Sequence, residues 1–96
     1  MFRHVVMMTF ADDTTDDELV GFADALSQLP ASIPEIRNYS VGLDAGLRDG
    51  NADLVVVGDF VDRDGFKAYM EHPEHRRVGS TFMKRTTEVV RVQYEL

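Results

Sequence analysis

The residue types best suited to proton transfer gather in one short segment of this chain, residues 69–75, with the sequence YMEHPEH. The segment holds two of the three histidines of the protein beside a tyrosine. Histidine titrates near neutral pH, and a tyrosine hydroxyl donates a hydrogen bond, so these groups can move a proton and stabilise an oxyanion. The third histidine lies in the first predicted strand. Folding can therefore bring four polar side chains to one place: His4, Tyr69, His72 and His75.

The spacing around Pro73 predicts a distinct role for each of these residues. Tyr69 and His72 are three residues apart on one expected helix, so they share a face. Pro73 suits the first turn of the next helix, where its missing N–H costs nothing. His75 then lies in that first turn, near the positive end of the helix dipole, which disfavours the imidazolium form. We expect a neutral His75 as general base, Tyr69 as hydrogen-bond donor to an enolate oxygen, and His4 as an orienting group.

Each residue also has a structural interpretation that involves no ligand. Tyr69 would then pack in the core with its hydroxyl in water, and His72 would only terminate its helix. His4 would be a core histidine with hydrogen-bonded ring nitrogens, and His75 would face solvent. A zinc site is a further alternative, but Pro73 separates His72 from His75, so the two are not held together on one helix. Since no phosphate-cradling glycine pattern is present either, we expect no metal and no cofactor.

The composition limits the class of protein and its partners. Ninety-six residues suit a single domain, residues 1–96, and the absence of cysteine excludes disulfides and favours a reducing, cytoplasmic location. A net charge of −7 repels phosphate backbones, so no nucleic-acid partner is expected. No apolar run has the length of a membrane helix and no signal peptide opens the chain, so no membrane partner is expected.

A local group of basic residues runs against the acidic balance of the chain. It consists of Arg76, Arg77, Lys84 and Arg85. One interpretation is a charged outer helix face that pairs with acidic neighbours, and the other is a site for an anionic ligand. The sequence leaves both open.

Four strands are predicted where apolar side chains alternate or run continuously, over residues 3–10, 36–43, 54–61 and 88–95. With the helical patterns between them, the order is strand, helix, strand, strand, helix, strand. This order is the split βαβ pattern of ferredoxin-like folds. We therefore expect an α+β protein with a ferredoxin-like βαββαβ protomer, a four-stranded antiparallel sheet and helices on one face.

Capping residues and prolines predict where the helices begin and end. Thr15 opens a capping box before the first helix, and Pro30 and Pro34 are expected to end that helix. Asp62 is expected to cap a short second helix, which Pro73 breaks. A further helix is expected from about residue 74 to residue 87.

Both faces of the two most apolar strands carry hydrophobic side chains. Val5 and Met7 of the first strand and Val55 and Val57 of the third point away from the face that the helices are expected to cover. In an antiparallel sheet with one solvent-exposed face, apolar and polar residues should instead alternate along each strand. We therefore expect a homodimer in which two sheets pack through their open faces. The alternative is a monomer with an exposed apolar patch, which soluble proteins rarely tolerate.

Three segments of the chain resemble the stress-responsive α/β-barrel family, called Dabb. They are residues 3–6 (RHVV), 33–36 (IPEI) and 68–75 (AYMEHPEH), in the order that the family shows. The resemblance covers essentially the whole chain and implies a dimeric α+β barrel built from ferredoxin-like protomers. Most members of the family have no assigned activity.

The resemblance also implies roles for the candidate residues. A plant polyketide cyclase of this family closes a linear thioester by intramolecular aldol condensation. Its catalytic tyrosine and histidine match Tyr69 and His75, its supporting strand histidine matches His4, and His72 matches as well. At three positions where that cyclase has small or apolar residues, this chain has the charged residues Glu74, Arg76 and Arg77. These charges argue against a long apolar polyketide as the substrate.

Three functions remain open from the sequence. The first is a Dabb protein of unassigned activity that binds a small, partly apolar organic molecule between sheet and helices. The second is a cofactor-independent enzyme in which His75 is the general base and Tyr69 the hydrogen-bond donor, for aldol cyclisation or enolisation. The third is a purely structural dimer with a filled core.

Overall fold

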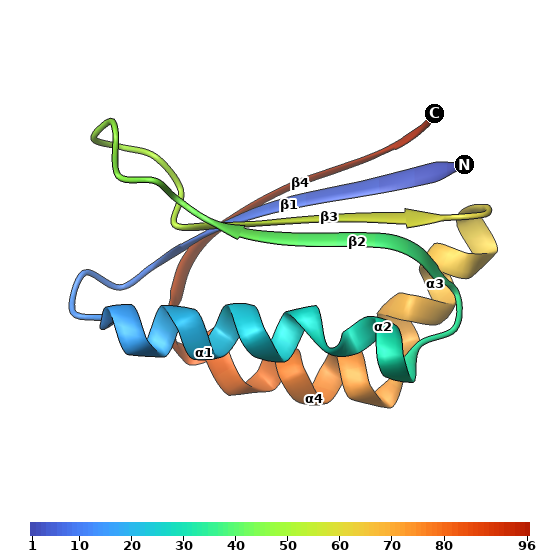
Figure 1. The fold of residues 1–96 in the computed structure, drawn as a ribbon, viewed down its shortest axis with the longest axis horizontal. Helices are drawn as coiled ribbons and strands as arrows, with labels where there is room; N and C mark the ends of the chain where they lie inside the picture. Colours follow the sequence, from blue (N-terminus) through green and yellow to red (C-terminus); the bar gives the residue numbers. More distant parts are fainter.

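The computed structural model describes residues 1–96 as a four-stranded antiparallel sheet with its helices on one face (Figure 1). The strand order is β2-β3-β1-β4. In chain order the elements are β1 (Phe2–Phe10), α1 (Asp16–Ser27), α2 (Leu29–Ser32), β2 (Ile36–Leu43), β3 (Leu54–Phe60), α3 (Arg63–Glu71), α4 (Pro73–Phe82), the 3-10 turn η1 (Met83–Arg85) and β4 (Thr86–Glu95). The predicted ferredoxin-like βαββαβ fold is confirmed. None of the helices is long and apolar enough to cross a membrane.

Two predicted helix caps are present and set where the helices begin. The backbone N–H of Glu18 donates to Thr15 Oγ1 at 3.1 Å, and the N–H of Thr15 donates to Glu18 Oε1 at 3.1 Å. This reciprocal pair satisfies donors that a helix N-terminus otherwise leaves free. At the start of α3, Asp62 Oδ1 accepts from the N–H of Gly65 at 2.9 Å.

Two predicted helix ends were wrong. The first helix stops at Ser27, before either proline. Pro30 lies in the first turn of α2, where a residue without an N–H is tolerated, and only Pro34 follows the end of the helical segment, since α2 ends at Ser32. The last helix stops at Phe82 and does not continue to residue 87, because the chain has already joined the sheet. The N–H of Ala11 donates to the carbonyl of Arg85 at 2.7 Å, and Thr86 is paired with Phe10 of β1.

The core lies between the sheet and the helices and is rich in aromatic rings. Phe10, Phe22 and Phe82 meet at one end of it, with ring centroids 5.4–6.1 Å apart. Phe60 lies toward the other end, 5.1 Å from the ring of Tyr69. Twelve buried residues form the core: Val6, Met8, Phe10, Leu26, Leu29, Ile33, Leu54, Val56, Phe60, Tyr69, Val78 and Phe82. Packing against these residues holds Tyr69 in place.

The opposite face of the sheet is apolar, and no helix covers it (Figure 1). Val5 of β1 is paired with Val57 of β3 on one side and with Val92 of β4 on the other, and Met7 is paired in the same way with Val55 and Val90. Val92 is 54% exposed. We call this surface the open face, made of Val5, Met7, Val55, Val57, Val90, Val92 and Tyr94.

The charges at one end of the open face neutralise each other. Arg3 donates from Nε to Asp59 Oδ1 at 2.7 Å and from Nη2 to Oδ2 at 2.9 Å. Asn38 adds a longer contact to Oδ2 at 3.4 Å. The Arg3 guanidinium holds the pKa of the Asp59 carboxyl below its usual value, so the pair stays ionised at neutral pH. The charges of Arg3 and Asp59 therefore offset each other at this end of the open face.

Candidate ligand pocket

A pocket of about 230 Å³ lies between the helix-covered face of the sheet and helices α1, α3 and α4. Three of the four candidate site residues line it: His4, Tyr69 and His75. The remaining walls are mostly apolar: Val6, Met8, Leu26, Val56, Met70, Gly79, Phe82, Met83, Val89 and Arg91. Hollows of about 410 and 470 Å³ lie elsewhere on the surface, but neither contains a histidine or a tyrosine. The smaller pocket is therefore the one that combines a concave shape with groups that can act chemically.

Tyr69 projects from α3 into the core and is only 2% exposed. Its hydroxyl lies 2.8 Å from the hydroxyl of Tyr39 on β2, so it does not reach water as its structural interpretation required. Burial raises the pKa of Tyr69 to about 12, and burial likewise raises the pKa of Tyr39. Both phenols are therefore protonated at neutral pH. Within this pair either hydroxyl can be the donor.

His75 is the third residue of α4, which begins at Pro73. Its ring centroid lies 4.4 Å from that of Tyr69. Its Nδ1 atom is buried and has no hydrogen-bond partner. Burial, assisted by the nearby charge of Arg76, lowers the pKa of His75, and the Met70 carbonyl opposes this shift without forming a well-aligned hydrogen bond. His75 is thus a neutral imidazole at pH 7, half-buried in the pocket and not facing solvent.

His4 lies on β1 and is 4% exposed. Its Nδ1 lies 2.9 Å from Nε2 of Gln93 on β4. In this orientation the Gln93 amide donates to Nδ1, so the neutral ring carries its proton on Nε2. Burial, and then the charges of His75 and Arg91, lower the pKa of His4 to about 4. His4 is therefore a neutral group in the pocket wall whose ring orientation is held by Gln93.

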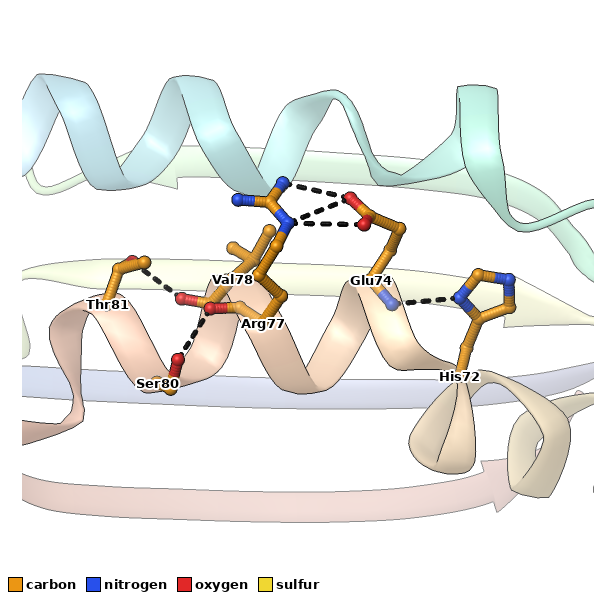
Figure 2. A network of polar contacts seen from close by, with 6 residues as sticks. All are labelled: His72, Glu74, Arg77, Val78, Ser80 and Thr81. Atoms are coloured by element: carbon orange, nitrogen blue, oxygen red, sulfur yellow. Dashed lines mark hydrogen bonds and ion pairs between the residues drawn. The ribbon is translucent and has the colours of Figure 1, made fainter.

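His72 does not line the pocket. Its Nδ1 accepts a hydrogen bond from the backbone N–H of Glu74 at 3.1 Å, which makes it the N-cap of α4 as well as the residue that ends α3 (Figure 2). In the same network the carboxylate of Glu74 accepts from Arg77, with Nη2 and Oε2 2.9 Å apart. The position of His72 agrees with the structural interpretation, since the residue lies between two helices and does not line the pocket.

Half of the basic group makes surface ion pairs. Arg77 pairs with Glu74 at 2.9 Å, and Arg85 pairs with Asp13 at 3.0 Å. Such exposed pairs contribute little to stability. Arg76 and Lys84 make no ion pair. The ion pairs of Arg77 and Arg85 agree with the interpretation of a charged outer face that pairs with acidic neighbours.

Two residues that hold pocket side chains in place were missed from the sequence, Tyr39 and Gln93. In the structure both lie on the strand face that points toward the helices, where Tyr39 contacts Tyr69 and Gln93 contacts His4. A polar side chain at a core-facing strand position needs a hydrogen-bond partner, and this was the available signal. The structure contains no group of three or more histidine, aspartate or glutamate side chains that could hold a metal ion.

The βαββαβ order of the elements, with an antiparallel sheet of order β2-β3-β1-β4 and helices on one face, defines a ferredoxin-like α+β protein. The pocket lies between the sheet and the helices. Solved structures agree. The chain is 41% identical to a dimeric ferredoxin-like protein of unknown function from Thermobifida fusca, covering 99% of this chain and 90% of that one, with a TM-score of 0.90. A dimeric protein of unknown function with a ferredoxin-like fold from Bacteroides fragilis is 29% identical, covering 99% and 95% of the two chains, with a TM-score of 0.86.

Residues 2–96 match the family described as Stress responsive A/B Barrel Domain, or Dabb, and the chain belongs to this family. A stress-response A/B barrel domain-containing protein of Arabidopsis thaliana is 26% identical over 97 residues, covering 97% of this chain and 84% of that protein. The resemblance inferred from three short segments is therefore confirmed. The biochemical activity of this Dabb protein is unassigned, as it is for the two solved relatives.

Proposed function

We propose that this protein binds a small, partly apolar molecule in the pocket between sheet and helices. The observation that carries the proposal is a pocket with mostly apolar walls that is also lined by three polar rings, those of His4, Tyr69 and His75. In such a pocket a few polar groups fix the orientation of the ligand, while the apolar walls bury the rest of it. The volume of about 230 Å³ is below the ~300–1,000 Å³ of pockets for drug-sized ligands, so the ligand is small.

The binding unit in this proposal is a homodimer joined through the open face. Two solved relatives are described as dimeric, which supports a dimer. The open face supports the mode of pairing, because Met7, Val90 and Val92 are 43–54% exposed on a continuous apolar surface. We assign the dimer to the cytoplasm, in keeping with the absence of cysteine.

Filling the pocket should abolish binding without damaging the fold. Gly79 lies on α4 at the pocket wall, and a Cβ added there meets no atom within 4 Å. Gly79→Leu therefore places a side chain in the pocket and also removes a poor helix former. Native mass spectrometry of protein purified gently from its own host should show a dimer with an organic adduct for the wild type and none for Gly79→Leu.

The matched control for this experiment is Gly21→Leu. Gly21 lies on α1, also has no atom within 4 Å of an added Cβ, and does not line the pocket. Gly21→Leu should keep the adduct. If both variants carry the same amount of adduct, the ligand binds elsewhere. The proposal would be refuted if the wild-type dimer never carries an adduct and takes up no compound from a fragment library.

A second candidate function is a cofactor-independent enzyme that acts on a carbonyl compound. The observation that favours it is a neutral imidazole and a protonated phenol with ring centroids 4.4 Å apart. His75 would remove a proton from the carbon next to a carbonyl, while Tyr69 donates a hydrogen bond to the carbonyl oxygen as it becomes an enolate. The enolate carbon would then attack a second carbonyl of the same molecule, forming the new C–C bond, and the resulting alkoxide would take the proton back from His75.

Replacing His75 distinguishes the two functions. His75→Ala should reduce turnover to the background rate in an enzyme and only change affinity in a binder. The measurement is deuterium exchange at the acidic carbon of a small 1,3-diketone, followed by NMR in D₂O. His72→Asn is the control, because asparagine keeps an N-cap and the residue lies outside the pocket, so exchange should be unchanged. Wild-type exchange that survives in His75→Ala would rule out His75 as the base.

A further inference from the structure

One charged side chain at the pocket has no partner. Arg91 lies on β4, paired with Val6, on the strand face that points toward the helices. It is the only arginine, lysine, aspartate or glutamate among the residues that line the pocket. Arg91 makes no ion pair and no side-chain hydrogen bond, and it is the only one of the four arginines without an ion pair that lines the pocket, the others being Arg37, Arg48 and Arg76. The pocket thus contains a cation and no anion.

The position of Arg91 makes its guanidinium available both to water and to the pocket. The residue is exposed overall, yet it is one of the pocket walls together with Val89 from the same strand. A long arginine side chain packs its methylene groups on apolar surface and keeps its charged end near water. Its charge also reaches into the pocket, since it contributes to the lowered pKa of His4. A core-facing strand position would otherwise favour an apolar residue.

We propose that the ligand of this pocket is a small carboxylate, and that Arg91 binds its carboxylate group at the mouth. The inference rests on the proposed function, because it requires that the pocket binds a small molecule. The planar guanidinium matches a carboxylate through two parallel hydrogen bonds. The apolar body of the ligand packs against Val6, Met8 and Phe82, and a polar group at its far end meets His75 and Tyr69. A ligand bound in the opposite orientation would leave Arg91 without a negatively charged partner.

A pair of probes that differ only in charge tests this assignment. The probes are 3-phenylpropionate and 3-phenylpropionamide, which have the same shape, titrated into ¹⁵N-labelled protein and followed by NMR at the backbone amides of Tyr69 and His75. The wild type should bind the carboxylate about fivefold more tightly than the amide, as expected for a charge-assisted pair that is partly exposed. Arg91→Gln should remove this preference and leave the affinity for the amide unchanged.

Lys67→Gln is the matched control, because Lys67 is an exposed residue of α3 that does not line the pocket. It makes the same change in net charge and should keep the fivefold preference. Equal affinities for the two probes in the wild type, or a preference that survives in Arg91→Gln, would overturn the carboxylate assignment and leave the binding pocket standing. If neither probe shifts Tyr69 or His75, the carboxylate assignment is overturned, and the binding pocket is refuted with it only if the adduct and the fragment library also give no ligand.

Discussion

Replacing Val92 by aspartate should convert the homodimer into monomers. Val92 lies on the open face, paired with Val5 of the central strand β1, and is 54% exposed in the single chain. The folded protomer therefore tolerates the substitution, whereas the dimer would bury an unpaired carboxylate at an apolar surface. Since an uncompensated buried charge costs several kcal/mol, the dissociation constant should rise more than about 100-fold. Aspartate is chosen over lysine because its short side chain cannot reach water around the edge of the interface.

Sedimentation velocity over a range of protein concentrations measures this change. The control is Val20→Asp, which makes the same substitution at a residue of α1 that is 48% exposed on the helical side of the molecule. This control should remain a dimer with the wild-type dissociation constant. A dimeric Val92→Asp protein, or dissociation by both variants, would show that the copies do not meet through the open face.

Acidification should destabilise the protein well above the pH at which most carboxylates titrate, because His4 is buried as a neutral group. Its pKa is about 4 in the folded protein, against about 6.5 when unfolded. The unfolded state therefore binds the proton first as the pH falls. Stability is complete above about pH 6.5, and His4 alone removes about 3 kcal/mol of unfolding free energy by about pH 4. His75, whose pKa is also lowered, acts in the same direction.

Urea unfolding at fixed protein concentration, repeated from pH 7.5 to pH 4, gives this dependence. His4→Gln retains a side chain that can bond to Gln93 but does not titrate, so its unfolding free energy should fall much less over this range. The carboxylates with lowered pKa, Asp59 and Glu74, lose their contribution at lower pH in both proteins. Equal slopes for the two proteins, or an NMR titration midpoint of His4 above about 6, would contradict the prediction.

The fold could be predicted because local patterns and the global arrangement agree. Alternation in β1 and the capping box at Thr15 each depend on residues close in sequence, and both are present in the structure. The end of α4 could not be predicted in the same way. It is set by the pairing of Thr86 with Phe10, residues at opposite ends of the chain, and not by any stop signal after Phe82.

The candidate site was predictable in its residue types and not in its hydrogen bonds. Tyr69 lies near the end of α3 and His75 lies in the first turn of α4, so the two are close in sequence as well as in space. Pro73, with which α4 begins, makes this arrangement predictable. The partners Tyr39 and Gln93 come from strands 30 and 89 residues away from Tyr69 and His4, respectively. Only the register of the sheet decides which side chains meet over such separations, and a single sequence does not contain that register.

The place of β1 in the sheet has a consequence for how the chain folds as it is synthesised. β1 is made first, but its neighbours in the sheet are β3 and β4, which are made later. Phe2 pairs with Glu95, so the last ladder closes only when nearly the whole chain has emerged. The segment Val5-Val6-Met7-Met8 has no strand partner until β3 has emerged, and until β4 has emerged one edge of β1 stays unpaired and the core is incomplete. Nascent chains of this protein therefore expose an aggregation-prone segment during most of their synthesis, and pairing between the two ends of the chain makes the final step slow.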